Sequence, residues 1–281
     1  MEAEQKAPAN AAEYISHHLA NLSSGGHHGG FWTFHLDTFW VSLVLGFVFV
    51  GLFGLVARRA SVDKPGRFQL FVEMIVEMVA GSVKEIFHGK STLVAPLALT
   101  VFVWIVLMNA MDFLPVDLAA KVMGAFGIEH FKVVPTADIN MTLAMSLSVV
   151  MISILLGIQT KGIVGFIKEF FTAPFHAENP LMVVLLLPIN ALMQLIEYGS
   201  RILSMALRLA GNMFAGELLF MLIALMGAAW TGSNSSSLAL AAGHLLAGSV
   251  WAIFHILIVV LQAYIFMMLT IVYCAMGVEE H

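Results

Sequence analysis

Long apolar stretches alternate with short polar segments along this chain, and the lengths of those stretches predict its fold. Residues 39–57 carry no charged side chain. About twenty apolar residues are enough for a helix to cross the hydrocarbon core of a bilayer, which is ~30 Å thick. Residues 91–111 and 139–158 are similarly apolar. The pattern therefore predicts three ordinary membrane-spanning helices before the chain reaches its C-terminal part.

The C-terminal part contains two apolar stretches that are too long for one perpendicular crossing. Residues 180–230 include only four charged side chains, and residues 238–278 include none. With a rise of 1.5 Å per residue, each would form a helix roughly 60–75 Å long, about twice the bilayer core. Either each stretch breaks into two spans, or each is one long, steeply tilted helix. Counted as one crossing each, they bring the total to about five, and the polar linker 231–237 joins them as a hairpin.

Residues 68–88 differ from these spans, because charged side chains recur along them. Glu73, Glu77 and Lys84 fall near one helical face, and most other positions are apolar. A crossing here would bury several charges. The pattern therefore predicts an amphipathic helix that lies at the membrane interface.

The composition supports a membrane protein over a soluble one. The chain is 60% apolar and 11% charged, whereas soluble domains carry roughly a quarter charged residues. Its net charge of −5 argues against a nucleic-acid surface, and its single cysteine excludes a disulfide framework. The polar start of the chain favours a retained first span over a cleaved signal peptide. We expect an all-α polytopic integral membrane protein, with an exposed N-terminal segment 1–38 and a single membrane domain 39–281.

The basic residues predict the orientation of the chain. With five crossings, most lysines and arginines fall in loops on one side, among them Arg58, Arg59, Lys64 and Lys161. The positive-inside rule assigns that side to the cytoplasm. The N-terminus is then expected outside and the C-terminus inside.

The N-terminal segment is rich in histidine among glycines and serines. The histidines are His17, His18, His27, His28 and His35. Clustered histidines can bind metal, but the polar, glycine-rich context favours a solvated terminus. We expect no metal or cofactor site.

Ionisable side chains within the first long helix are the main functional signal, because charges inside a membrane are costly. On a helix that turns about 100° per residue, Glu197 and Ser204 lie within about 40° of Arg208, whereas Glu217 faces the opposite side. Glu197 and Arg201 are four residues apart, and a purely structural ion pair is an alternative for them. Arg208 has no carboxylate three or four positions away, so its partner is expected in another chain.

The last helix carries one thin polar stripe. Four side chains lie within about 20° of a common line, namely His244, His255, Gln262 and Tyr273. A hairpin about 231–237 brings Arg208 to the level of Gln262 and Glu217 to the level of His255. Glu217 and His255 can gain and lose protons, whereas Arg208 is permanently charged. The pattern predicts a proton path that is interrupted by a fixed positive charge. His244 lies near the outer edge of the helix, and for this residue a structural role is the main alternative to a role in the proton path.

Three other classes of function remain as alternatives. A secondary transporter would show inverted repeats, and no convincing repeat relates the two halves. An intramembrane metalloenzyme would need clustered ligands such as HExxH within a span, and none is present. A structural scaffold gives no reason to bury Arg208. No phosphate-binding GxxxxGK[ST] loop is present either, which agrees with a chain that performs no nucleotide chemistry.

Several motifs resemble one family. The run LRLAGNMFAGE at 207–217 and the run WAIFHILIVVLQAYIFMMLTIVY at 251–273 are similar to signatures of subunit a of F-type ATP synthases, and FWTFHLD, MDFLPVD and VVPTADIN at 31–37, 111–117 and 133–140 extend the resemblance over nearly the whole chain. The resemblance implies a proton-translocating stator subunit in the bacterial inner membrane, with a periplasmic N-terminus and a cytoplasmic C-terminus. The implied partners are a ring of c subunits, the subunit b stalk, the rest of the synthase and membrane lipids. Catalysis would reside in other subunits.

The resemblance also implies residue roles. Arg208 matches the arginine that faces the c-ring carboxylates and prevents proton leak between two offset half-channels. Glu217 and His255 would line the periplasmic half-channel, with Gln262 and Asn212 as polar neighbours of the arginine. The expected periplasmic access residues are Asp37, Asn109, Asp112, Asp117 and Asp138. The candidates for the cytoplasmic exit are Glu197, Ser200 and Ser204. Ile202 stands where many relatives have a proline, so we expect a straighter helix there.

Overall fold

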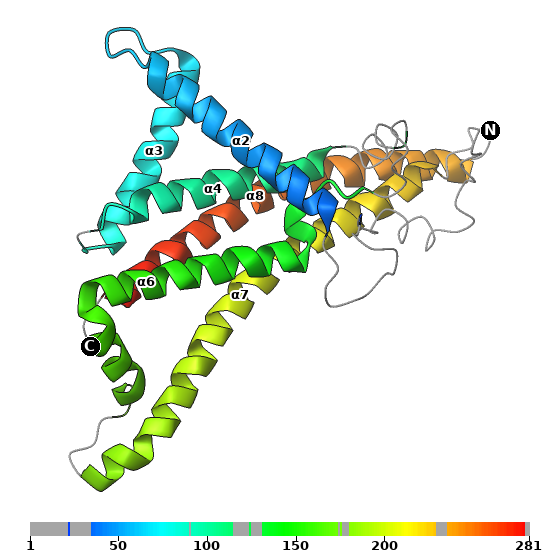
Figure 1. Ribbon diagram of the computed structural model, residues 1–281. Coiled ribbons are helices and arrows are strands. Elements are labelled where there is room, and N and C mark those ends of the chain that lie inside the picture. Colours follow the sequence, from blue (N-terminus) through cyan, green and yellow to red (C-terminus); the bar gives the residue numbers. More distant parts are fainter. Residues whose placement is uncertain are drawn as a thin grey trace. The chain divides into compact units, whose positions relative to one another are not determined.

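A computed structural model describes residues 22, 35–89, 91–114, 124, 131–173, 175, 180–228 and 235–278. Within these residues the long elements are the helices α2 (Leu36–Arg59), α3 (Arg67–Ile86), α4 (Val94–Ala110), α6 (Ile139–Thr172), α7 (Pro180–Ala228) and α8 (Ser235–Val278), shown in Figure 1. Two 3-10 helices are short: η1 (Met111–Phe113) follows α4, and η2 (Pro135–Ala137) precedes α6. Some predictions concern residues outside those described. These residues are Asp117, most of segment 1–38 and residues 231–234 of the expected hairpin linker.

The predicted fold class is confirmed. Among the described residues, five helices are long and apolar enough to cross a membrane, and they are α2, α4 with η1, α6, α7 and α8. Helix α3 is amphipathic, since its buried side chains Val72, Val79 and Val83 share one face while its charged residues are exposed. The two longest helices each run as one continuous element, and α7 is unbroken at Ile202.

Helix α6 extends beyond the predicted span 139–158. It continues to Thr172 across a kink at Gly162, whose φ of 73° lies in the region that only glycine adopts readily. The Lys161 ammonium binds both carboxylate oxygens of Glu169 beyond the kink, at 2.8 and 2.6 Å. Element α6 therefore consists of two helices that meet at Gly162, and the first of them contains the predicted span.

The described chain divides into two compact units. Unit 1 contains the residues up to Val48 together with Ile105–Met141 and Ala210–Leu261. Unit 2 contains Phe49–Trp104, Thr142–Leu209 and the chain from Gln262 onward. Each of the five helices that can cross a membrane contributes residues to both units, whereas α3 belongs to unit 2 alone.

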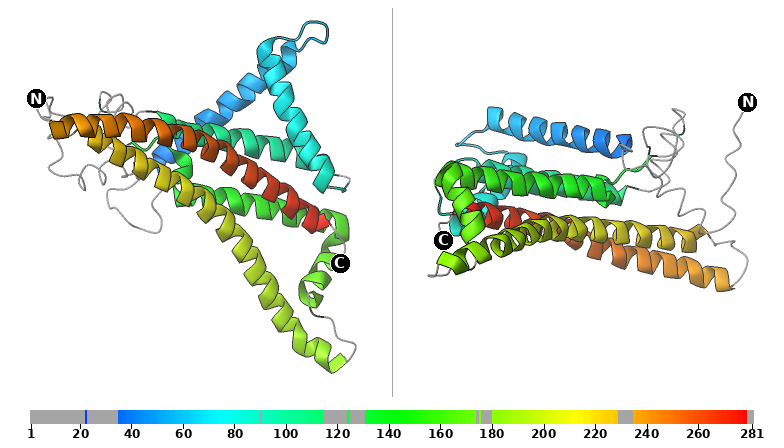
Figure 2. Two further views of the ribbon diagram at one scale, coloured as in Figure 1. Left: turned by 180° about the vertical axis from the view of Figure 1, so that it is seen from behind. Right: turned by 60° about the horizontal axis from the view of Figure 1, so that its bottom comes forward.

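Small residues bring helices into close contact within each unit. In unit 2, a Cβ on Gly157 would lie 2.7 Å from the Gly277 carbonyl oxygen, and the Ser153 hydroxyl donates to the Tyr273 carbonyl oxygen at 2.5 Å. In unit 1, the last part of α7 and the first part of α8 lie side by side (Figure 2), and a Cβ on Gly243 of α8 would lie 3.1 Å from Met226 Cε of α7. Glycine and serine at these contacts allow the backbones to approach closely.

Candidate functional site

Four of the buried ionisable side chains of unit 1 come from four separate segments and lie close to one another. Asp112 lies in η1, Lys132 just before η2, Glu217 on α7 and His255 on α8. None of these residues is more than 7% exposed, and His255 is fully buried. The burial of several charges is costly unless the groups neutralise one another. Ionisable groups that are retained inside a membrane protein usually serve a function.

The four side chains form two pairs. The His255 Nε2 atom lies 2.7 Å from Asp112 Oδ2, and the Lys132 Nζ atom lies 3.3 Å from Glu217 Oε2. Within the described part of the chain, Asp112 Oδ2, Glu217 Oε2 and both His255 nitrogens nevertheless have no partner with hydrogen-bond geometry. The pairs are close enough for charge interaction, and they retain donor and acceptor capacity that a proton or a water molecule can use.

His255 is held in an aromatic surrounding beside α7. Its ring centroid lies 5.4, 5.1 and 5.9 Å from those of Phe113, Phe220 and Trp251. Gly216 supplies the space on α7, because a Cβ there would clash with His255 Cε1 and lie 3.2 Å from Asp112 Oδ2. Gly216 directly precedes Glu217 on α7. Its contact with His255 therefore agrees with the predicted hairpin register, in which Glu217 lies at the level of His255.

The other predicted access residues of unit 1 make different contacts. Asp37 is fully buried and accepts three backbone N–H bonds, from Leu22 at 2.9 Å, Thr38 at 2.8 Å and Lys132 at 3.0 Å. These bonds tie the start of α2 to the segment that presents Lys132. Asn109 is also buried and donates to the Val259 carbonyl oxygen at 3.4 Å, while its Oδ1 has no hydrogen-bond partner among the described residues.

Asp138 lies where η2 meets α6. Its Oδ2 lies 2.5 Å from His35 Nδ1 and accepts from the Thr38 hydroxyl at 3.1 Å. Its Oδ1 accepts from the backbone N–H of Asn140 at 2.9 Å. Like Asp37, Asp138 therefore binds the N-terminal part of unit 1 to the segment around η2.

Lys132 and Gly216 are two site residues that sequence reasoning missed. The sequence gives Lys132 no motif of its own, although it directly precedes the motif VVPTADIN. Its ammonium also lies 5.8 Å from the Phe214 ring centroid, which adds a cation–π contact. Gly216 lies within the motif LRLAGNMFAGE, but only the position of the His255 ring reveals why a glycine is needed.

Unit 2 contains Arg208, which is exposed on α7. Its Nη2 donates to the Ser204 hydroxyl at 3.1 Å. Among the residues that the structure describes, no carboxylate forms an ion pair with it. Gln262, predicted at the same level, is buried in unit 2 with 8% exposure.

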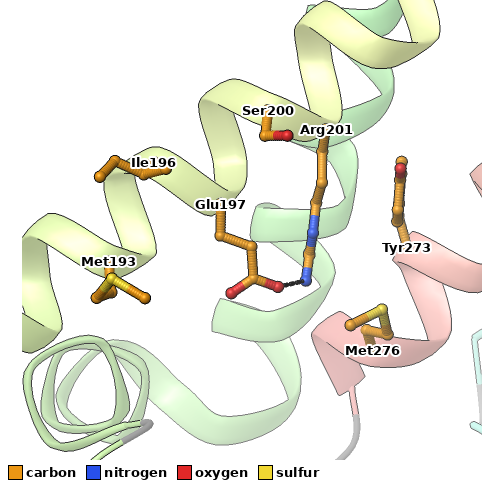
Figure 3. Close-up of a pocket in the computed structure, with 7 residues that line it drawn as sticks. All are labelled: Met193, Ile196, Glu197, Ser200, Arg201, Tyr273 and Met276. Atoms are coloured by element: carbon orange, nitrogen blue, oxygen red, sulfur yellow. Dashed lines mark hydrogen bonds and ion pairs between the residues drawn. The ribbon is translucent and has the colours of Figure 1, made fainter.

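A pocket of about 490 Å³ lies about two to four helical turns before Arg208 along α7, between α7 and α8 of unit 2 (Figure 3). Glu197, Ser200 and Arg201 line it from α7, and Tyr273 lines it from α8. Arg201 forms an ion pair with Glu197, and its guanidinium carbon lies 5.4 Å from the Tyr198 ring centroid and 5.2 Å from that of Tyr273. The Glu197–Arg201 pair is therefore present, and it lines this pocket together with the apolar side chains of Met193, Ile196 and Met276.

Fold and site together define a polytopic α-helical membrane protein that buries ionisable groups inside a helix bundle. Residues 38–275 match the family model described as ATP synthase A chain. The chain is 51% identical to ATP synthase subunit a of Chromobacterium violaceum over 97% of its own length and 99% of the relative's. It is 47% identical to the protein of that name from Shewanella loihica, with 95% and 96% covered, and 45% identical to that from Coxiella burnetii, with 96% and 97% covered.

The chain belongs to the ATP synthase subunit a family. It is accordingly a multi-pass protein of the bacterial inner membrane and part of the proton-translocating membrane sector of an ATP synthase. The catalytic sites of such a complex lie in its other sector.

Proposed function

We propose that this subunit leads protons through two offset half-channels to the carboxylates of a c-ring, and that Arg208 separates the two paths. The observation that carries the proposal is the exposed position of Arg208 without a carboxylate partner in the described chain. An arginine cannot practically lose its charge, and a lone charge within a membrane span is costly. A carboxylate from a neighbouring subunit would satisfy it.

The surroundings of Arg208 on α7 support a partner helix at this face. The exposed residues after it include Gly211 and Asn212, and a Cβ built on Gly211 would meet no atom within 4 Å. Small residues allow close helix approach. Asn212 and Gln262 are proposed as polar neighbours that orient the guanidinium or the incoming carboxylate.

The proposed periplasmic half-channel uses the buried pairs of unit 1. Glu217 and His255 carry the proton, and Asp112 and Asn109 line its route. The free hydrogen-bonding capacity of these buried atoms supports the assignment. For Asp37 and Asp138, the backbone and side-chain bonds that they accept favour a role in holding the access side together. Asp117 stays a prediction.

The proposed cytoplasmic exit uses the pocket of unit 2. Glu197 and Ser200 line it, and Ser204 stands one helical turn before Arg208 and accepts its hydrogen bond. Glu197 can take up the proton that a c-ring carboxylate releases and pass it to water. An exit on the cytoplasmic side requires that the N-terminus lies in the periplasm and the C-terminus in the cytoplasm. Subunit b and the rest of the synthase are further proposed partners.

In the proposed cycle, a proton from the periplasm passes Glu217 and His255 and neutralises a c-ring carboxylate. The neutral group can turn through lipid, whereas its charged form would cost several kcal/mol to bury. The carboxyl then releases its proton on the cytoplasmic side and passes Arg208 as an anion. A membrane potential contributes about 2.3 kcal/mol per charge for each 100 mV.

The test replaces Arg208 by alanine in the complete synthase and measures ATP-driven proton pumping and passive proton conductance in membrane vesicles. We expect pumping to fall to background while the complex still assembles, with a raised passive leak. The variant Leu207→Ala is the control, because it truncates the neighbouring exposed side chain of the same helix without removing a charge. Normal pumping by Arg208→Ala in an assembled complex would refute the proposal.

A further inference from the structure

Unit 2 contains another pocket, which is lined by residues from the end of α2, the segment after it and the start of α3; Figure 1 shows these two helices and the connection between them. Its volume is about 350 Å³, and its walls combine two kinds of side chain. Leu52, Leu55 and Phe68 supply apolar surface, and Arg59 and Lys64 supply positive charge. Arg59 is the last residue of a helix that can cross the membrane, so the pocket lies at the level where hydrocarbon gives way to headgroups and water.

The charge around this pocket is strongly positive and unpaired. Four basic side chains fall within residues 58–67, with Asp63 as the one acidic residue of that stretch. Among the described residues, none of the four takes part in an ion pair. The four cations are Arg58, Arg59, Lys64 and Arg67. The stretch therefore lacks an anionic partner of its own.

The backbone at this pocket adds donors for an anion. The N-cap of α3 is Gly66, which lines the pocket and provides no side-chain cap, so the first N–H groups of α3 are without the usual side-chain acceptor. Such a helix start favours a phosphate or carboxylate. Gln69 fixes the loop, since its side chain accepts from the Ser61 N–H at 3.1 Å and donates to the Ser61 carbonyl at 3.0 Å and to Glu73 at 2.7 Å.

We infer that this pocket binds the headgroup of an anionic phospholipid, with its phosphate between Arg59, Lys64 and the start of α3. The acyl chains would follow the apolar wall of Leu52 and Leu55, which are 41% and 54% exposed. Basic pockets beside membrane helices select anionic lipids in this way. A free phosphate ion would leave the apolar wall uncovered, and a zwitterionic lipid would leave the positive charge uncompensated. The inference depends on the membrane location of the chain and not on the proposed half-channels.

The test uses the purified complete synthase in vesicles of phosphatidylcholine that contain a small fraction of photoactivatable phosphatidylglycerol. After illumination, the amount of lipid attached to the peptide 52–69 is measured by mass spectrometry. Any cation near a membrane surface contributes roughly a fivefold preference for anionic lipid, and a cation that binds the phosphate directly adds roughly tenfold through its charge-assisted hydrogen bond. We expect Arg59→Gln and Lys64→Gln each to lower the attachment by roughly tenfold more than Arg58→Gln does. The matched control is Arg58→Gln, which removes the same charge from the neighbouring position that does not line the pocket.

Equal losses in Arg58→Gln and Arg59→Gln would overturn the inference, because they would show a diffuse basic surface without a site. Equal labelling of the peptide by photoactivatable phosphatidylcholine would overturn it as well. Competition by inorganic phosphate that removes the labelling at low concentration would assign the pocket to a soluble anion instead. Recovery of intact complex and normal ATP hydrolysis in all three variants ensures that a loss of labelling does not reflect a loss of assembly.

Discussion

In unit 1 the charged side chains Asp112, Lys132 and Glu217 are buried beside His255, whereas in unit 2 Glu197 and Arg208 are exposed on α7. The buried groups find their partners within the chain. Arg208 finds none in the described part of it, although it too lies in an apolar span. The contrast supports the proposal that unit 1 contains the periplasmic proton path, while Arg208 and Glu197 of unit 2 face the c-ring or water.

The same contrast determines what each substitution should cost. The removal of one partner from a buried ion pair leaves an uncompensated charge and typically costs about 3–5 kcal/mol. The removal of one partner from an exposed pair costs about 0–1 kcal/mol, because solvent screens both charges. Stability and proton transport should therefore respond together in unit 1 and separately in unit 2.

Glu217→Gln is expected to have the largest effect. It removes the carboxylate that we propose as a proton carrier, and it leaves the Lys132 ammonium buried without its partner at 3.3 Å. We expect proton pumping in vesicles to fall to background. We also expect the assembled complex to lose about 3–5 kcal/mol of stability, measured as a lower temperature of heat denaturation.

The double variant Lys132→Met, Glu217→Gln separates these two effects. It removes both charges, so most of the lost stability should return, while pumping should stay at background because the carrier is still missing. Recovery of pumping in the double variant would show that Glu217 serves only to neutralise Lys132.

Gly216→Ala is expected to have the next largest effect. The added Cβ would clash with His255 Cε1 and lie 3.0 Å from Nδ1, so the ring must move away from Asp112. Overpacking of this kind costs about 1–3 kcal/mol, and pumping should fall severalfold. The matched control is Gly54→Ala on α2, where a Cβ would meet nothing within 4 Å; the same loss of pumping in both would show that the His255 contact is irrelevant.

The elements predicted correctly from the sequence are those that depend on local pattern. The five apolar crossings follow from stretch length, and the Glu197–Arg201 pair follows from their spacing on one helix. The roles of Lys132 and Gly216 could not be predicted, because each depends on a residue of a distant segment. The second helix of α6, beyond the kink at Gly162, was not predicted, because hydropathy alone does not reveal it.

Glu197→Ala tests the opposite side of the comparison. The pair with Arg201 is partly exposed, with 48% of the Glu197 side chain accessible, so the complex should lose at most about 1 kcal/mol of stability. Pumping should nevertheless fall severalfold if the pocket is the exit. Glu197→Asp should restore part of it, whereas unchanged pumping in Glu197→Ala would remove this pocket from the proton path.

The smallest expected effect comes from His244, the other histidine of α8 in unit 1. Its Nδ1 donates to the Ile223 carbonyl oxygen at 2.7 Å, and a Cβ on Gly227 would lie 3.0 Å from the ring. The ring therefore packs and hydrogen-bonds between α8 and α7. His244→Ala should cost about 1 kcal/mol of complex stability, the value of one hydrogen bond, and should leave pumping unchanged. His255→Ala in the same helix should abolish pumping. If His244→Ala also reduced proton transport in proportion to His255→Ala, the polar stripe of α8 would conduct along its whole length, and the restriction of the path to the buried pairs would be wrong.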